Sequence, residues 1–160
     1  MSHMQLVFVL PQHTSNCVVE TLDKIEEALG PGLFQLVFPA ILTDNGHEFC
    51  DIQGMERSLY GGTRTKVFFC DPNRSDQKGA CEVNHKLIRN IIPKGTPIDD
   101  LTQADANLIT NHINSYVRKS LYGKCPYDIA IPLLPEDFFI GLGLEQIPAD
   151  QVILKPLLLN

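Results

Sequence analysis

Two acidic residues of this chain, Asp44 and Glu82, have the type and setting needed to hold a metal ion. Asp44 follows the apolar residues 40–42 and precedes Asn45-Gly46, a dipeptide typical of tight turns, so we expect Asp44 at the carboxyl end of a buried strand. Glu82 lies in a later helical pattern. Cleavage or transfer of a phosphodiester bond requires carboxylates that hold two divalent cations about 4 Å apart. Hard carboxylate oxygens suit Mg²⁺ or Mn²⁺, so both residues are candidate metal ligands.

Each acidic residue also has an ordinary structural interpretation. An Asp before Asn-Gly is most often a turn-initiating residue. A Glu at the centre of a polar helix face is usually solvated and paired four residues on, here with Lys86. Taken singly, both residues favour the structural interpretation. By similar reasoning we expect His47 and His85 at the surface, whereas Glu48 is either an outer carboxylate of a metal site or the opening residue of a helix.

Three cations, Lys78, Lys86 and Arg89, lie near Glu82 in the sequence. They could contact phosphates of a bound nucleic-acid strand, although a short charge cluster on an exposed helix is more often only a soluble face. The net charge of the chain is −6, which argues against nonspecific DNA binding by the whole surface. It permits such binding only at a local basic patch.

The elements that must position these residues form a mixed α/β pattern. Short apolar runs predict strands at Gln5–Leu10, Ala40–Leu42 and Lys66–Phe69. Periodic segments predict three helices: one capped by Thr14 or Ser15 and ended by Gly30-Pro31, one from Gly79 to Ile92, and one from Thr102 to about Val117. In the second helix one face is apolar, and Glu82 lies near the centre of the opposite polar arc. We expect a surface loop over Cys50–Thr65.

Composition limits the class of protein. At 160 residues and 44% hydrophobic, the chain is long enough for one globular domain with a core. No apolar run approaches the roughly 20 residues of a membrane helix, so we expect a cytoplasmic protein without a membrane partner. The five cysteines lack zinc-site spacing, which favours reduced, mostly buried thiols. Residues 1–4 look like an expression-vector scar, and the apolar, proline-punctuated residues 119–160 should dock on the core or on a partner subunit.

Several segments occur in one fixed order along the chain. They are Ile41–Phe49 with its Thr-Asp-Asn-Gly-His-Glu motif, Phe69–Pro72, Gln77–His85 and Ile92–Thr96. Together they resemble the DDE transposases of bacterial insertion sequences, over about residues 5–129. The resemblance implies an α/β catalytic core like that of retroviral integrases, with a ribonuclease-H-like fold and an Asp, Asp, Glu metal site.

By this resemblance Asp44 is the second catalytic aspartate and Glu82 the catalytic glutamate, and both are ligands of Mg²⁺ or Mn²⁺. The implied partner is DNA, as transposon ends and as target. Water would first free a 3′-hydroxyl, which would then attack the target without a covalent protein intermediate. The candidate DNA contacts are Asn45, Lys78, Asn84 and Lys86 by resemblance, and Arg89 as a further phosphate contact.

The chain also departs from the family pattern. The family's first aspartate lies on its first strand, whereas Gln5–Leu10 aligns best with the third. We therefore expect residues 5–118 to be a partial integrase-like core without its first two strands and without one metal ligand. Asp23 cannot replace that ligand because it falls within a helix. The strand before Asp44 would then have an open edge, which Gln5–Leu10 or pairing across a homo-oligomer should cover.

We keep three hypotheses for the function. The first is a fragment of a transposase catalytic core that is inactive or very weak alone. The second is a non-catalytic oligomerisation module or a transposase remnant, which assembles subunits through the apolar residues 119–160. The third is a ribonuclease-H-like nuclease that shares only the fold, which the Asp71-Pro72 and Pro93-Lys94-Gly95 segments disfavour.

Overall fold

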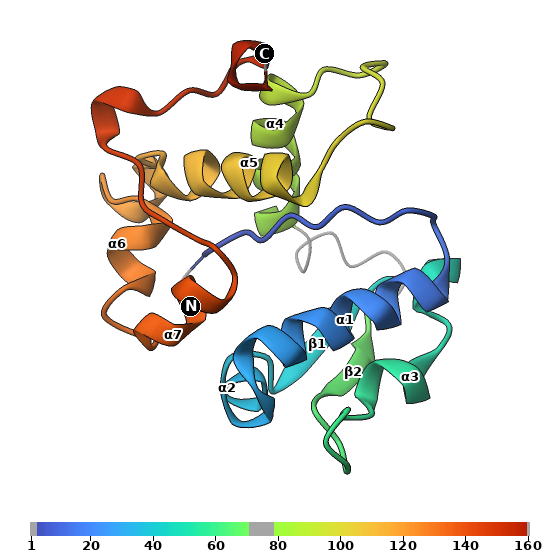
Figure 1. Ribbon diagram of the computed structural model, residues 1–160. Coiled ribbons are helices and arrows are strands. Elements are labelled where there is room, and N and C mark those ends of the chain that lie inside the picture. The colour runs from blue at the N-terminus through green and yellow to red at the C-terminus, as the bar shows by residue number, and fades with distance from the viewer. Residues whose placement is uncertain (1–2, 71–78, 160) are drawn as a thin grey trace. The chain divides into compact units, whose positions relative to one another are not determined.

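The computed structural model describes residues 3–70 and 79–159, and for residues 79–84 the description is limited to the backbone. The expected mixed α/β character is confirmed: the described part contains helices and one two-stranded parallel sheet. The chain divides into two compact units. We call Leu10–Gln77 the sheet unit, and Met1–Val9 with Lys78–Asn160 the helical unit, and Figure 1 labels the elements of each.

The sheet unit begins with a helix that the sequence predicted. Thr14 Oγ1 accepts a hydrogen bond from the Cys17 N–H at 3.4 Å, and Gly30 ends the helix with a φ of +74°. The segment after Gly30 is a second helix, because Pro31 suits the first helical turn. The elements of the unit are α1 (Ser15–Leu29), α2 (Pro31–Val37), β1 (Ala40–Thr43), η1 (His47–Phe49), α3 (Ile52–Glu56) and β2 (Lys66–Phe69).

The two strands expected at residues 40–42 and 66–69 are confirmed, and they pair in parallel. Figure 1 shows α1 lying along this sheet. Ile41 and Val67 pack against the buried cluster that α1 and α3 supply, which consists of Val18, Val19 and Met55. Leu42 and Phe68 are paired on the other face, and each is 55% exposed. Period-two alternation therefore buries one apolar face of the sheet and leaves apolar side chains on the other.

The segment Cys50–Thr65 is not only the surface loop that we expected. It contains α3 and ends with Arg64, whose side chain is fully buried. The Arg64 guanidinium donates through Nε to the Met55 carbonyl at 2.9 Å and through Nη2 to the Gly54 carbonyl at 3.0 Å. These bonds satisfy two carbonyl groups of α3 inside the protein. The polar segment that carries Arg64 is therefore packed against α3 through a buried side chain.

Two carboxylates of α1 neutralise this buried arginine. Arg64 Nη1 lies 2.6 Å from Asp23 Oδ1 and 3.2 Å from Glu26 Oε2. Glu26 is itself fully buried, and it also accepts hydrogen bonds from the Ser58 hydroxyl and the Leu59 N–H. We call this arrangement the Arg64 network. It joins α1 to the segment between α3 and β2, because a buried charge requires both a counter-charge and hydrogen bonds.

The helical unit contains the other two helices that the sequence predicted. Thr102 and Asp105 form the expected capping box, with the Thr102 N–H donating to Asp105 Oδ2 at 2.8 Å. The helix ends at Ser115, two residues before the expected Val117, because Tyr116 has extended backbone angles. The elements are α4 (Gly79–Ile91), α5 (Gln103–Ser115), η3 (Lys119–Leu121), α6 (Pro126–Ala130), α7 (Glu136–Gly141), η4 (Ala149–Gln151) and η5 (Pro156–Leu159).

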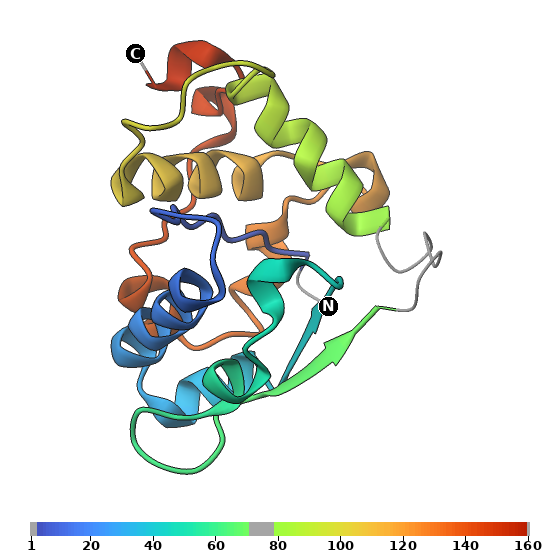
Figure 2. The ribbon, with the colours of Figure 1, turned by 90° about the vertical axis from the view of Figure 1, so that its right-hand side faces the viewer.

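The core of the helical unit lies between α4 and α5, which cross in Figures 1 and 2. Ile91 of α4 and Ile109 and Ile113 of α5 are almost completely buried there. The C-terminal segment packs on the same core through Leu154, Leu158 and Leu159. Thus these three leucines are covered within their own unit, whereas Leu157 is 67% exposed.

One polar contact fixes this C-terminal segment to α5. The Ile153 N–H donates to His112 Nδ1 at 3.0 Å, so the imidazole accepts through that nitrogen and is neutral. Burial lowers the pKa of His112 below its ordinary value, because desolvation disfavours the charged imidazolium. The contact is therefore one that acidification should weaken.

The predicted strand Gln5–Leu10 is wrong, because this extended segment belongs to no described sheet. Alternate N–H groups donate instead to side-chain oxygens of α5: Gln5 to Asn114 at 2.9 Å, Val7 to Thr110 at 3.1 Å and Val9 to Gln103 at 3.1 Å. Asn114 and Gln103 also donate to carbonyl groups of the segment. We call these contacts the α5 clamp. They satisfy backbone groups that a neighbouring strand would otherwise satisfy, so this segment does not cover the edge of β1.

Two further expectations concern cysteines and membranes. The four cysteine side chains that the structure describes are free thiols, of which Cys17 and Cys125 are buried. Cys50 is exposed, contrary to the buried environment expected for most of them. Within residues 3–70 and 79–159, no helix is long and apolar enough to cross a membrane.

Candidate functional site

Asp44 lies at the carboxyl end of β1, as the sequence predicted. The strand ends at Thr43, and Asp44 is exposed immediately after it. Its Oδ1 accepts a hydrogen bond from the Gly46 N–H at 3.1 Å, which forms the expected turn. A carboxylate has about four lone-pair sites, so this turn is compatible with metal ligation as well.

The end of the neighbouring strand supports this position. The Cys70 N–H donates to the Thr43 carbonyl at 2.7 Å, so parallel pairing continues to the last residue before Asp44. The carboxyl ends of parallel strands are the usual place for ligand sites in α/β proteins. Asn45 and His47 are exposed at the same end of β1.

Glu48 has a partner that neither sequence interpretation named. His13 Nε2 lies 2.9 Å from Glu48 Oε1. The Glu48 carboxylate also lies close over the turn, because a Cβ atom on Gly46 would fall 2.6 Å from Glu48 Oε2. A side chain at position 46 would therefore make this carboxylate move, which the flexible Glu48 side chain permits. Glu48 lies in η1 and connects the turn after Asp44 to the residues that precede α1.

The second expected ligand, Glu82, lies on α4 of the helical unit. Its side chain and that of Asn84 lie outside the described side chains, and Lys78 lies outside the described residues. The candidate phosphate contacts Lys86 and Arg89 are exposed on α4, and so is His85, as expected. Asp44 and Glu82 thus belong to different compact units.

A bound metal ion needs several ligand side chains close together. Among residues 3–70 and 85–159, no group of three or more His, Cys, Asp or Glu side chains is arranged to hold one. The hard oxygens of Asp44 suit Mg²⁺ or Mn²⁺. The donor chemistry of Asp44 therefore fits Mg²⁺ or Mn²⁺. The metal site itself stays a prediction.

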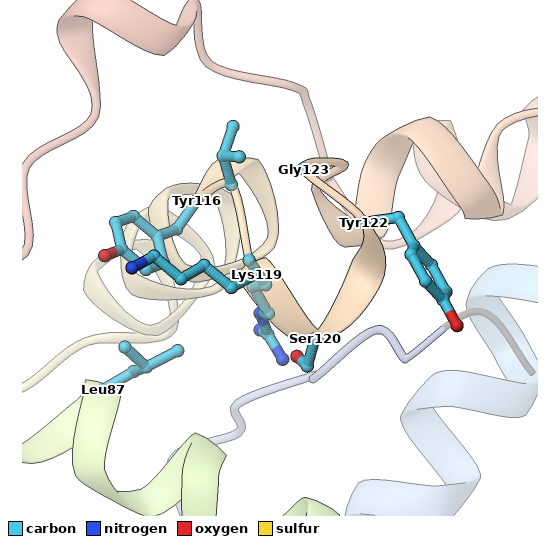
Figure 3. A pocket seen from close by; sticks show the side chains of 8 residues that line it. Leu87, Tyr116, Lys119, Ser120, Tyr122 and Gly123 are labelled. Atoms are coloured by element: carbon cyan, nitrogen blue, oxygen red, sulfur yellow. The ribbon is translucent and has the colours of Figure 1, made fainter.

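One surface feature of the helical unit, a hollow, was not predicted from the sequence. A hollow of about 680 Å³ lies between α4 and the residues after α5, and Figure 3 shows the side chains that line it. Its lining includes Leu87, Tyr116, Arg118, Lys119, Ser120 and Tyr122. A signal was present in the sequence, because residues 106–127 contain no acidic residue while Arg118, Lys119 and Lys124 fall close together.

Comparison with known proteins gives three relatives with related names. The transposase for insertion sequence element IS1086 of Cupriavidus metallidurans is 27% identical over 135 residues, 84% of this chain and 37% of that protein. The transposase for element IS4351 of Bacteroides fragilis is 36% identical over 51% of this chain and 24% of its own length. Transposase InsI for element IS30A of Escherichia coli K12 is 39% identical over 42% of this chain and 18% of its own length.

These matches define what is shared. The match to the IS1086 transposase covers 135 of the 160 residues. Wherever it begins, a stretch of that length includes the segments around both Asp44 and Glu82. The chain spans between about a fifth and two fifths of the length of these relatives. No known protein-family profile matches the chain, and no solved structure matches it. The resemblance of this chain to the transposases of bacterial insertion sequences is thus confirmed at the level of sequence.

Proposed function

We propose that this chain is part of a transposase catalytic core, the part that carries the second aspartate and the glutamate of an Asp, Asp, Glu site. The observation that supports this most directly is the exposed position of Asp44 at the carboxyl end of a parallel strand, within a stretch related to transposases. A ribonuclease-H-like fold is part of the proposal. The parallel pairing of β1 with β2 beneath α1 is compatible with such a core.

In this proposal Asp44 and Glu82 hold Mg²⁺ or Mn²⁺. The ion would activate the attacking oxygen and stabilise the leaving oxygen of a phosphodiester. The hydrogen bond from Gly46 limits rotation of the Asp44 carboxylate, so the turn orients one candidate ligand before any ion binds. With two of the three family carboxylates assigned, we expect strand cleavage and joining by this chain alone to be absent or very weak.

The proposed substrate is DNA, both transposon ends and target. Lys86 and Arg89 are exposed on α4, which supports their proposed role as phosphate contacts, and Asn45 is exposed next to Asp44 in the sequence. Lys78 and Asn84 complete the proposed contacts by resemblance. A local basic face of this kind is what a chain of net charge −6 requires for DNA binding.

Iron-mediated cleavage of the protein backbone tests the metal site. Fe²⁺ replaces Mg²⁺ at carboxylate sites, and with ascorbate and peroxide it cuts the chain near the bound ion. We expect cuts near Asp44 and near Glu82 in the full chain, and we expect both sets to disappear in Asp44→Asn and in Glu82→Gln. Asp150→Asn is the matched control, because Asp150 is an exposed carboxylate in a different segment. The shared metal site would be refuted if the full chain showed no cuts near either residue, or if the cuts in Asp44→Asn were unchanged.

We further propose that this chain forms a homo-oligomer through the exposed face of the sheet. Leu42 and Phe68 form an apolar pair there at 55% exposure each, which favours contact with another surface. Light scattering should show a larger particle for the natural chain than for Phe68→Asp. Equal masses for the two proteins would remove this part of the proposal.

A further inference from the structure

Tyr122 combines two features that folding alone does not favour. Its φ of +56° places a residue other than glycine in the left-handed region, where side chains with a Cβ atom are disfavoured. Its side chain is also 98% exposed, so the ring gains almost nothing from burial. A backbone outlier of this kind is a reason to look for a function at that residue.

The turn that carries Tyr122 is well anchored. The N–H groups of Arg118 and Gly123 bond to the carbonyls of Lys124 and Arg118, at 3.0 and 3.2 Å, and the Tyr122 N–H bonds to the Lys119 carbonyl at 3.1 Å. Leu121, between the exposed residues, is buried. We call residues 116–124 the tyrosine turn. Its backbone hydrogen bonds fix the turn, and the Tyr122 side chain projects from it into solvent.

The hollow beside this turn has the chemistry of a base and phosphate site. In Figure 3 Tyr116 and Tyr122 stand at opposite ends of the hollow, Ser120 lies between them, and the Lys119 side chain extends toward the Tyr116 ring. Tyr116 is 44% exposed, and no acidic residue lines the hollow. Aromatic faces take any nucleic-acid base by stacking, and cations between them can contact the connecting phosphates.

We propose that the tyrosine turn binds single-stranded nucleic acid, with a base stacked on Tyr122 and another phosphate of the same strand at Lys119. The inference rests on the proposed function, because it assigns to a nucleic-acid enzyme a further contact surface on the helical unit. Single-stranded nucleic acid fits better than a duplex, since a duplex keeps its base faces stacked inside. The lining is cationic while the whole chain carries a charge of −6, so charge complementarity favours a polyanion at this hollow.

The test measures affinity by fluorescence anisotropy, with a short labelled single strand of mixed sequence and with the same sequence as a duplex. We expect the full natural chain to bind the single strand more tightly. Tyr122→Asn should weaken that binding by about tenfold or more, whereas Tyr122→Phe should retain it because the ring face remains. Lys119→Ala should lower the slope of log affinity against log salt by about 0.7, the value for one phosphate of a single strand.

Stability serves as the second measurement. Asparagine tolerates the left-handed region better than tyrosine, so Tyr122→Asn should melt no lower than the natural chain. A loss of affinity without a loss of stability is the result that a merely structural tyrosine could not give. Tyr60→Asn is the matched control, because Tyr60 is 59% exposed in the sheet unit, and it should bind as the natural chain does.

Three results would overturn the inference. They are no binding of the single strand by the natural chain, equal affinity of Tyr122→Asn and the natural chain, and tighter binding of the duplex without dependence on Tyr122. A protein partner at the hollow would give the first of these. The proposed function is judged separately, because iron cleavage near Asp44 does not depend on the tyrosine turn.

Discussion

Replacement of Arg64 by alanine is expected to remove most of the stability of the sheet unit. The substitution deletes a fully buried guanidinium and leaves Glu26, also fully buried, without its counter-charge. Breaking a buried ion pair on one side typically costs about 3–5 kcal/mol, because the remaining charge stays desolvated. Small domains have a total unfolding free energy of about 5–15 kcal/mol, so this loss approaches the whole stability of a unit of this size.

The chain supplies a matched control in Arg57. Both arginines pair with Asp23, at 2.8 Å for Arg57 and 2.6 Å for Arg64. The Arg57 side chain is 47% exposed, so its ion pair is weakened by water and salt. Arg57→Ala should therefore cost only about 0–1 kcal/mol. The two substitutions remove the same charge from Asp23, and their difference measures what burial and the further bonds of Arg64 add.

Urea denaturation followed by far-ultraviolet circular dichroism gives the unfolding free energies, since the chain has no tryptophan. Because the chain has two compact units, amide hydrogen exchange should assign the loss. Arg64→Ala should raise exchange in α1 and leave the capped helix α5 protected. If Arg64→Ala and Arg57→Ala cost the same, or if α5 loses protection as strongly as α1, the account of the Arg64 network is incorrect.

Three other outcomes follow from described contacts. Gly54→Ala should destabilise by about 1–3 kcal/mol, because its Cβ would lie 2.8 Å from a methyl group of α1, whereas Gly32→Ala meets nothing within 4 Å and should be neutral or stabilising in thermal melts. The folded state of His112 has a lowered pKa, so the unfolded state binds its proton first, and stability should fall as pH drops below about 6.5 with early loss of Ile153 amide protection. His112→Gln should abolish that dependence in denaturation curves at several pH values. Asn114→Ala should cost about 1–3 kcal/mol in urea titrations, since it leaves two backbone groups of the α5 clamp without their side-chain partner.

Local sequence signals predicted the elements that local physics decides. Thr14 and Thr102 begin helices because their hydroxyls satisfy N–H groups of the first turn. Gly30 ends α1 because only a residue without Cβ readily adopts its positive φ. The position of Asp44 followed from an apolar run and a turn motif in adjacent residues. Half of the candidate site was therefore accessible from the sequence.

The errors concern partners that are distant in sequence. Residues Gln5–Leu10 alternate like a strand, yet their hydrogen-bond partners lie about a hundred positions away on α5, and no local pattern reveals them. Arg64 in a polar segment looked exposed, and only Asp23 and Glu26, some forty positions earlier, explain its burial. Tyr122 was missed because its left-handed conformation is a property of the folded turn.

The α5 clamp makes one helix behave as a peptide receptor whose ligand is part of the same chain. The side chains of Gln103, Thr110 and Asn114 bond to main-chain groups of the segment Gln5–Val9, at every second residue. These hydrogen bonds do not select side chains, but proline is barred at the bonded positions, and Val7 also packs against the core of the helical unit. The covalent connection supplies a high local concentration, so we expect these five modest hydrogen bonds to hold a segment that would dissociate as a separate peptide.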